Sequence, residues 1–236
     1  MQDVAVIIPA KDEADRIAAT VTAARKLPGA DLVVVVDDGS SDRTGQVARE
    51  AGARVVRHSR NRGKGAAMET GAEAVRLLDP GRHLLFLDAD LADTAAAAAP
   101  LVEPVRAGEA DMTIAVFSAT VKLGGHGFVV RLSREGIRRA TGWDATQPLN
   151  GQRCLTRAAF DAALPLAPGF GVETALTIDL LRQGFRVREV EVPLAHRATG
   201  TDWHAQVHRA RQFRDVARAL AAREPVIADR LRGRRA

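Results

Sequence analysis

Two carboxylates separated by one residue, Asp88 and Asp90, directly follow the apolar run at residues 84–87. Side chains at this spacing can point the same way once a strand gives way to a turn. Oxygen ligands of this kind hold Mg²⁺ or Mn²⁺, and a substrate diphosphate then completes the coordination shell. A lone Asp-x-Asp pair is also typical of a helix cap beside a solvated turn. The pair therefore predicts a metal site only if other polar groups gather near it.

Other residues with chemical potential follow three further apolar runs. Asp37 and Asp38 come after residues 32–36, where a carboxylate can accept a hydrogen bond from a ribose hydroxyl or a base N–H. The same D-G-S-S-D segment is equally good turn and N-cap chemistry. Lys64 lies between two glycines, which suits a phosphate or a nucleobase carbonyl, although the spacing is not that of a Walker loop. The run at residues 4–8 is followed by Pro9, Ala10, Lys11, Asp12 and Glu13.

The elements that must position these residues alternate between short apolar strands and longer helices. Strands are expected at residues 4–8, 32–36, 54–57, 84–87 and 112–117, with helices at 13–26, from Asp42, and at 65–78. Such alternation predicts an α/β protein whose mostly parallel sheet is covered by helices on both faces. Ligands of open parallel sheets bind at the carboxyl ends of the strands, where all four polar segments fall.

The second half of the chain elaborates this core. Helices are expected at residues 129–140, 171–182 and 204–223, and strands at 152–155 and 185–192. The sequence contains no internal repeat and no linker, so one domain is expected over residues 1–236. Within it, residues 1–118 form the alternating core, residues 119–223 elaborate it, and residues 224–236 would form a basic tail.

Six ordered segments carry a resemblance to a known family. VIIPAKDE, VVDDGSSDRT, RGKG, LDADL, QPLNGQRCLTR and LAPGFGVETALTIDLL, with a later strand that leads to His-Arg, are similar to the GT-A glycosyltransferases of family 2. The likeness is greatest to the glucosyl-3-phosphoglycerate synthases and their actinobacterial relatives, and it spans roughly residues 4 to 220. It implies a GT-A fold, which is a Rossmann-like, mostly parallel sheet flanked by helices, here with a C-terminal helical extension. Residues 1–118 would then bind the nucleotide sugar, and residues 119–223 would bind the acceptor.

The resemblance also implies which residues bind the donor, a nucleoside diphosphate sugar with UDP-glucose favoured. Asp37 would bind the base, and Lys64, in its glycine loop, would contact the nucleotide. Asp88 would face the ribose or the donor sugar. The remaining substrate-binding residues implied are Pro9, Ala10, Lys11, Glu13, Gly63, Ala89 and Gly151.

Catalysis is assigned by the same resemblance. Asp90 and His196 would ligate Mg²⁺ or Mn²⁺, which neutralises charge on the leaving diphosphate. Glu173 would lie near the transferred sugar. In an inverting enzyme, a carboxylate must deprotonate the acceptor, and Glu173 and Asp144 are the candidates. In a retaining enzyme, Glu173 would orient the sugar instead.

Two departures from the family pattern bear on the substrates. The synthases hold their phosphorylated acceptor with an arginine and a threonine in a flexible glycine loop, but residues 124–128 contain neither. A phosphoglycerate acceptor is therefore not expected, and the acceptor stays unassigned. Lys11 stands where an aromatic or aliphatic residue is common, so contacts to the base would differ.

Parts of this sequence pattern also occur in other classes of protein. A polyprenyl-phosphate sugar transferase at the membrane surface remains open, because the helix at residues 204–223 is rich in arginine. A haloacid-dehalogenase-type phosphatase is excluded because that class carries Asp-x-Asp on its first strand, whereas Asp88 and Asp90 follow the fourth expected strand here. A dinucleotide dehydrogenase is excluded because Pro9 replaces the glycine-rich turn. A non-catalytic binding relative is disfavoured, because every expected motif position is filled.

Composition limits the partners. The net charge is +5, the isoelectric point is about 10.2, and all but four of the 34 basic residues are arginines. Aromatic residues make up only 4%, which argues against a nucleic-acid-binding module. A single cysteine excludes an internal disulfide. No apolar run could span a bilayer and no export signal is visible, so a cytoplasmic location, or one peripheral to the membrane, is expected. Relatives of this kind suggest a homodimer.

Overall fold

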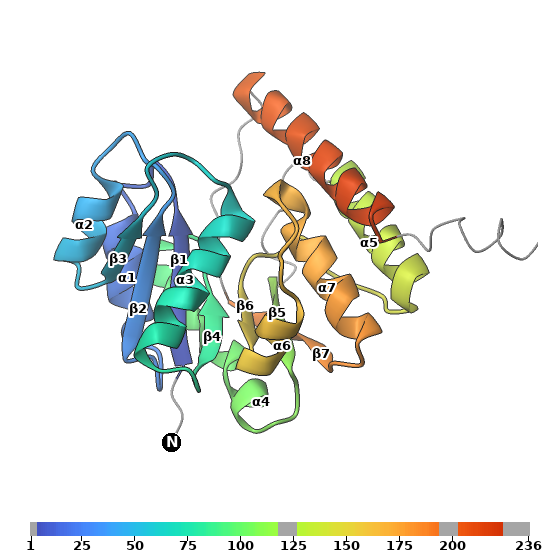
Figure 1. Ribbon diagram of the computed structural model, residues 1–236, viewed down its shortest axis with the longest axis horizontal. Helices are drawn as coiled ribbons and strands as arrows, with labels where there is room; N and C mark the ends of the chain where they lie inside the picture. Colours follow the sequence, from blue (N-terminus) through green and yellow to red (C-terminus); the bar gives the residue numbers. More distant parts are fainter. Residues whose placement is uncertain (1–3, 118–126, 194–202, 224–236) are drawn as a thin grey trace, which may run out of the picture.

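The computed structural model describes residues 4–117, 127–193 and 203–223, and within the last range the side chains from residue 210 onward. One seven-stranded sheet organises these residues (Figure 1). The strands are β1 (Val4–Ala10), β2 (Leu32–Asp37), β3 (Arg54–Arg57), β4 (His83–Phe86), β5 (Met112–Phe117), β6 (Arg153–Leu155) and β7 (Val187–Val192). Their order across the sheet is β3-β2-β1-β4-β6-β5-β7.

All pairings in the sheet are parallel except the two made by β6. This three-residue strand runs antiparallel between β4 and β5. Because β6 points the other way, its amino end lies at the same edge of the sheet as the carboxyl ends of β1, β2 and β4. The prediction of a mostly parallel α/β sheet is confirmed, and the antiparallel insertion is a feature that it did not contain.

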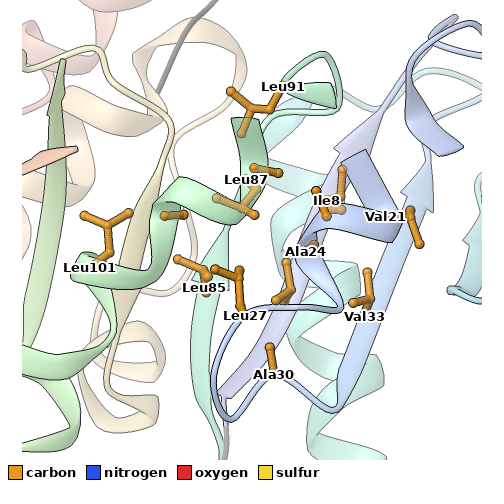
Figure 2. Packing of buried hydrophobic residues seen from close by; sticks show 14 of the residues in the cluster. Ile8, Val21, Ala24, Leu27, Ala30, Val33, Leu85, Leu87, Leu91 and Leu101 are labelled. Atoms are coloured by element: carbon orange, nitrogen blue, oxygen red, sulfur yellow. The ribbon is translucent and has the colours of Figure 1, made fainter. Parts of the chain in front are cut away.

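Helices cover both faces of the sheet. They are α1 (Ile17–Ala24), α2 (Thr44–Glu50), α3 (Lys64–Leu78), α4 (Glu103–Arg106), α5 (Gly127–Thr141), α6 (Arg157–Ala162), α7 (Val172–Arg182) and α8 (Trp203–Ala221), with 3₁₀ helices η1 (Ala92–Leu101) and η2 (Gly169–Gly171). One face packs against α1 and η1 (Figure 2), and the other packs against α3, α6 and α7.

The alternation along β1 explains how both faces become core. Val4, Val6 and Ile8 contribute to the cluster under α1, whereas Ala5 and Ile7 contribute to the cluster under α3. All five are fully buried, which is typical of a parallel strand covered on both sides.

Four short helical elements, η1, α4, α6 and η2, were not expected from the sequence. The alanine-rich segment after β4 forms η1 rather than a regular α-helix, with Pro100 inside it and Ala92 in the left-handed region at φ 49°. The segment after β6 forms α6, which Thr156 caps by accepting a hydrogen bond from the Ala159 N–H. The first helix is also shorter than expected, because residues 13–16 form turns before Ile17.

The C-terminal helix α8 packs onto the domain beside α5, α7 and η2 (Figure 1). Val216 and Ala219 are its buried residues among those whose side chains are described. Gly136 of α5 allows a close approach, since a Cβ there would overlap the side chain of Leu220. Within the described residues, none of the helices is both long enough and apolar enough to cross a membrane.

Candidate active site

The loops that follow β1 and β2 are joined by hydrogen bonds. The Asp12 carboxylate accepts from the backbone N–H of Ser41 at 2.7 Å and from its hydroxyl at 2.9 Å. Thr44 accepts from the Glu13 N–H at 2.8 Å. The Lys11 ammonium and the Ser41 N–H hold the pKa of Asp12 down at about 2, so this carboxylate stays ionised. The two loops therefore form one rigid wall at the edge of the sheet.

The residues at and just after the end of β1 that are predicted to bind the substrate differ in exposure along this wall. Ala10 is buried and Pro9 is half-buried, whereas Lys11 is exposed and its ammonium pairs with Asp12. Glu13 is half-buried at the start of the turn that leads to α1. The Lys11 side chain therefore points toward Asp12.

Asp37, at the end of β2, is completely buried. One of its oxygens accepts from the Ser40 N–H at 2.9 Å. The other lies beneath the first turn of α2, where a Cβ on Gly45 would come within 2.6 Å of it, and Arg57 lies 3.5 Å away. Asp37 therefore fixes the D-G-S-S-D turn, and its proposed contact with the base stays a prediction.

Asp38 holds the glycine loop that precedes α3. Its carboxylate accepts from the backbone N–H groups of Arg62 and Gly63, each at 2.8 Å. His58 lies 2.7 Å from the same carboxylate through Nδ1, and its Nε2 lies 2.9 Å from the hydroxyl of Thr70. Gly63 has φ 89°, a conformation that favours glycine. These bonds show that Asp38 positions the loop that carries Lys64, and a contact between Asp38 and a nucleotide stays a prediction.

Lys64 joins two carboxylates that are far apart in the sequence. Its Nζ lies 2.8 Å from Asp88 Oδ1 and 2.8 Å from Glu173 Oε1. Burial alone lowers the pKa of the Lys64 ammonium, but the two carboxylates outweigh that effect and raise it above the usual value of a lysine. Gln152 completes the cluster by donating to Asp88 Oδ2 at 2.6 Å. The structure thus brings together three residues predicted from separate motifs.

Gly151 is required by this cluster. A Cβ at this position would overlap Lys64 Nζ and would come within 2.8 Å of Asp88 Oδ1. The antiparallel direction of β6 delivers Gly151 and Gln152 to the edge where β4 ends. The sequence singled out Gly151 without a geometric reason, and close approach now supplies one.

Arg153 is a residue that the sequence analysis missed. It is 1% exposed, and its guanidinium donates to the backbone oxygens of Pro148, Asn150 and Glu173 and to the hydroxyl of Thr177. Burial lowers its pKa to about 10, which leaves it protonated at neutral pH. Arg153 ties the start of α7 to the loop before β6 and so positions Glu173.

The turn after β4 carries Asp90. Thr20 of α1 donates to the Ala89 oxygen at 2.8 Å, and Arg16 donates to the backbone oxygen of Asp90 at 3.1 Å. Ala89 is buried and Asp90 is half-buried. The turn is therefore fixed from the opposite side of the sheet to Lys64.

The second predicted metal ligand, His196, lies outside the described residues. Across residues 4–117, 127–193 and 203–223, no group of three or more histidine, cysteine, aspartate or glutamate side chains is arranged to hold a metal ion. Most of the glycine loop predicted to meet the acceptor also lies outside them. Asp144, the other candidate base, is exposed after α5, whereas Glu173 is buried beside Lys64.

A mostly parallel sheet with polar loops at its carboxyl edge, and with a partly buried cluster of a lysine and two carboxylates there, defines an α/β protein of the class that binds ligands at this edge. The sequence model of glycosyl transferase family 2 matches residues 5–161. The chain belongs to this family, which confirms the resemblance seen in its motifs.

Individual relatives show how far the similarity extends. The glycosyltransferase AglJ of Haloferax volcanii is 32% identical over 84% of this chain. The undecaprenyl-phosphate 4-deoxy-4-formamido-L-arabinose transferase of Edwardsiella ictaluri is 29% identical over 83% of it. The chain spans only 65% and 60% of the lengths of these two proteins.

A solved structure confirms the GT-A fold. Glucosyl-3-phosphoglycerate synthase of Mycobacterium tuberculosis, in complex with Mn²⁺, UDP and glucosyl-3-phosphoglycerate, superposes with a TM-score of 0.76 at 28% sequence identity. The match covers 94% of this chain and 80% of that one.

Proposed function

We propose that this chain is a metal-dependent glycosyltransferase that moves a hexose from a nucleoside diphosphate sugar to a small or phosphorylated acceptor. The observation that carries the proposal is the convergence of Lys64, Asp88 and Glu173 at the carboxyl edge of the sheet. In an open α/β sheet this edge is where nucleotides bind. A donor of the UDP-glucose type is favoured, because the similar mycobacterial synthase was solved with UDP and a glucosylated product.

The donor would lie along the wall formed by the β1 and β2 loops. Pro9, Ala10 and Lys11 would line the base and ribose together with Glu13, and Asp37 would bind the base. The hydrogen bonds between these loops support this role, because they hold the wall in place before any ligand arrives. Preorganisation of this kind lowers the cost of binding.

The metal site is assigned to Asp90, with His196 as the second ligand. Both oxygens of Asp88 already accept hydrogen bonds, from Lys64 and Gln152, so direct ligation falls to Asp90 on the neighbouring turn. Carboxylate oxygens at a strand end are the ligands that Mg²⁺ and Mn²⁺ prefer, and the donor set therefore fits. A bound divalent ion supplies Lewis-acid stabilisation of the leaving diphosphate.

Lys64 and Glu173, which are paired with each other, would act side by side at the reacting bond. The protonated Lys64 adds positive charge where the departing diphosphate gains negative charge. Glu173 Oε1 is already held by Lys64, so we assign Glu173 to orienting the donor sugar rather than to removing a proton. This role suits a retaining reaction, and the anomeric configuration of the product, read by NMR, tests it.

A thermal-shift and calorimetric screen of UDP, GDP and ADP sugars, each with and without Mn²⁺, tests the proposal. We expect one class of nucleotide to bind, and to bind more tightly with Mn²⁺. Asp90→Ala should abolish the effect of Mn²⁺. Asp93→Ala is the matched control, because Asp93 is an exposed carboxylate three residues further along the same segment. Failure of every nucleotide to bind, or an equal response of the two variants, would overturn the assignment.

A polyprenyl-phosphate acceptor is the second candidate. The similarity to an undecaprenyl-phosphate transferase favours it, as does the absence of the expected arginine and threonine from residues 124–128. Incubation with the labelled donor and either a short-chain polyprenyl phosphate or 3-phosphoglycerate separates the two. Transfer to the first compound alone would establish this candidate.

A further inference from the structure

The basic charge of the chain is concentrated on two neighbouring helices. Together, α5 and α8 carry eight arginines and two acidic residues, Glu135 and Asp215, a surplus of six against a net charge of +5 for the whole chain. The remainder of the molecule is therefore close to neutral overall. The high isoelectric point reflects one region rather than a general bias.

The same two helices expose aromatic rings. Phe128 of α5 is 65% exposed and Phe213 of α8 is 38% exposed, and their ring centroids lie 5.4 Å apart. The guanidinium of Arg131 lies 5.9 Å from the centre of the Phe128 ring. Exposure of phenylalanine to water is unfavourable. The two phenylalanine rings, in contact with each other beside a cation, form a small apolar patch within a basic surface.

This apolar patch continues as a stripe along both helices. Helical spacing places Leu132 on the same face of α5 as Phe128, and Ala217 and Leu220 on the same face of α8 as Phe213. These three residues are half-buried where α5 and α8 pack together, and they line a hollow of about 480 Å³ between α5, α7 and α8 whose other lining residues include Glu135, Arg139, Arg182 and Arg223. We call Phe128, Phe213 and these three residues the α5–α8 stripe.

Arginines flank the stripe on both sides. Helix geometry places Arg131 and Arg138 on the outer side of α5, and Arg211, Arg214 and Arg218 on the outer side of α8. All five are exposed, and two of them form ion pairs on their own helices, Arg138 with Glu135 and Arg214 with Asp215. An apolar stripe between two rows of exposed guanidinium groups is the pattern of a helix surface that lies in the headgroup region of a bilayer.

The stripe begins close to the candidate active site. Asp215, two residues after Phe213, accepts from the Phe170 N–H at 3.3 Å, and Phe170 lies three residues before Glu173. Gly169 leaves the room for this contact, since a Cβ there would overlap the Asp215 carboxylate. Helix α8, which carries Phe213 on another side, therefore packs against the segment that leads to Glu173 in the candidate active site.

We propose that the α5–α8 stripe binds the surface of a membrane that contains anionic lipids. Lipid phosphates complement the flanking arginines, and Phe128 and Phe213 enter the boundary between headgroups and acyl chains. Single-stranded nucleic acid fits less well, because the two rings pack against each other instead of offering free faces for stacking. A second copy fits less well too, since a two-fold contact would oppose the two sets of arginines.

Co-sedimentation with vesicles tests the proposal independently of any sugar donor. The chain should bind vesicles of phosphatidylcholine that contain roughly one third phosphatidylglycerol. Its affinity for vesicles of pure phosphatidylcholine should be lower by a factor of roughly ten or more. Arg211→Gln and Arg218→Gln should each weaken binding by roughly fivefold. Phe128→Ser with Phe213→Ser should weaken it at every salt concentration, because that loss is apolar.

Matched variants on the opposite half of the sheet serve as controls. Arg49→Gln, Arg54→Gln and Leu77→Ser change exposed residues of the same types on α2, β3 and α3, and should leave vesicle binding unchanged. Circular dichroism of every variant checks that the fold is intact. The proposal is overturned if the vesicles do not bind, or if controls and stripe variants respond equally. It is also overturned if the stripe variants leave vesicle binding unchanged but abolish either the binding of an oligonucleotide or the formation of a dimer in solution.

Discussion

Replacing Lys64 with methionine should expose how the candidate site is held together. The substitution keeps most of the side-chain volume but removes the ammonium that lies 2.8 Å from both Asp88 and Glu173. The two carboxylates then remain in the same confined space without their shared cation. Lost attraction and new repulsion both act against the folded state.

The size of the effect follows from the burial of the three side chains. Lys64 is 25% exposed, Asp88 27% and Glu173 9%. Removing one partner of a buried ion pair costs about 3 to 5 kcal/mol, and the partial exposure of two members places this case near 3 kcal/mol. For a chain of this length, that corresponds to a fall in Tm of roughly 6 to 12 °C.

Differential scanning calorimetry at neutral pH measures this loss, and a second substitution identifies its cause. Lys64→Met combined with Glu173→Gln should be more stable than Lys64→Met alone, because one of the two carboxylates has gone. The coupling between the two positions should be at least about 1 kcal/mol. Lys26→Met is the control, since Lys26 is exposed, and should change stability by less than about 0.5 kcal/mol.

Two results would refute the reasoning. If Lys64→Met and Lys26→Met unfold at the same temperature, the cluster does not contribute to stability. If the Glu173→Gln change adds its own loss to that of Lys64→Met, repulsion between the carboxylates is not the cause.

Three further outcomes follow from the same contacts. Gly151→Ala should displace Lys64 from Asp88 and weaken donor binding, and calorimetric titration against the donor measures it; an unchanged affinity would mean that the cluster tolerates the methyl group. Asp38→Asn should weaken binding of the nucleotide sugar by roughly tenfold, since an amide N–H would face the backbone N–H of Gly63 or Arg62. Retained affinity would contradict the positioning role of Asp38. Cys154 should resist thiol reagents at pH 8 until the protein unfolds, because burial raises its pKa to about 12; reaction in the native protein, followed by absorbance, would disagree.

The four polar strand ends could be predicted from the sequence because their geometry is fixed by topology. Once residues 4–8, 32–36 and 84–87 are parallel strands, their carboxyl ends must lie at one edge, and Asp37 and Asp88 with them. The stripe of Ile17, Val21 and Ala24 was also predictable, and all three are fully buried. Local periodicity was sufficient in these cases.

Arg153 and the Asp38 network could not be predicted in the same way. Arginine is ordinarily exposed, and Arg153 is satisfied largely by backbone oxygens, which leave no mark on the sequence. The contacts of Asp38 with His58 and Gly63 cross between loops of two strands. The strand at residues 152–155 was predicted, but its antiparallel direction between β4 and β5 was not, because a run of three residues carries no information about its pairing.

The position of β6 has a consequence for how the chain folds. In the part of the chain that the structure describes, β5 pairs with β6 and β7 and with no earlier strand. The predicted nucleotide half, residues 1–118, therefore ends in a strand whose partners are synthesised up to 75 residues later, at Val192. The two halves should not survive as separate fragments, and during translation the sheet cannot be completed until β7, which ends at Val192, has left the ribosome.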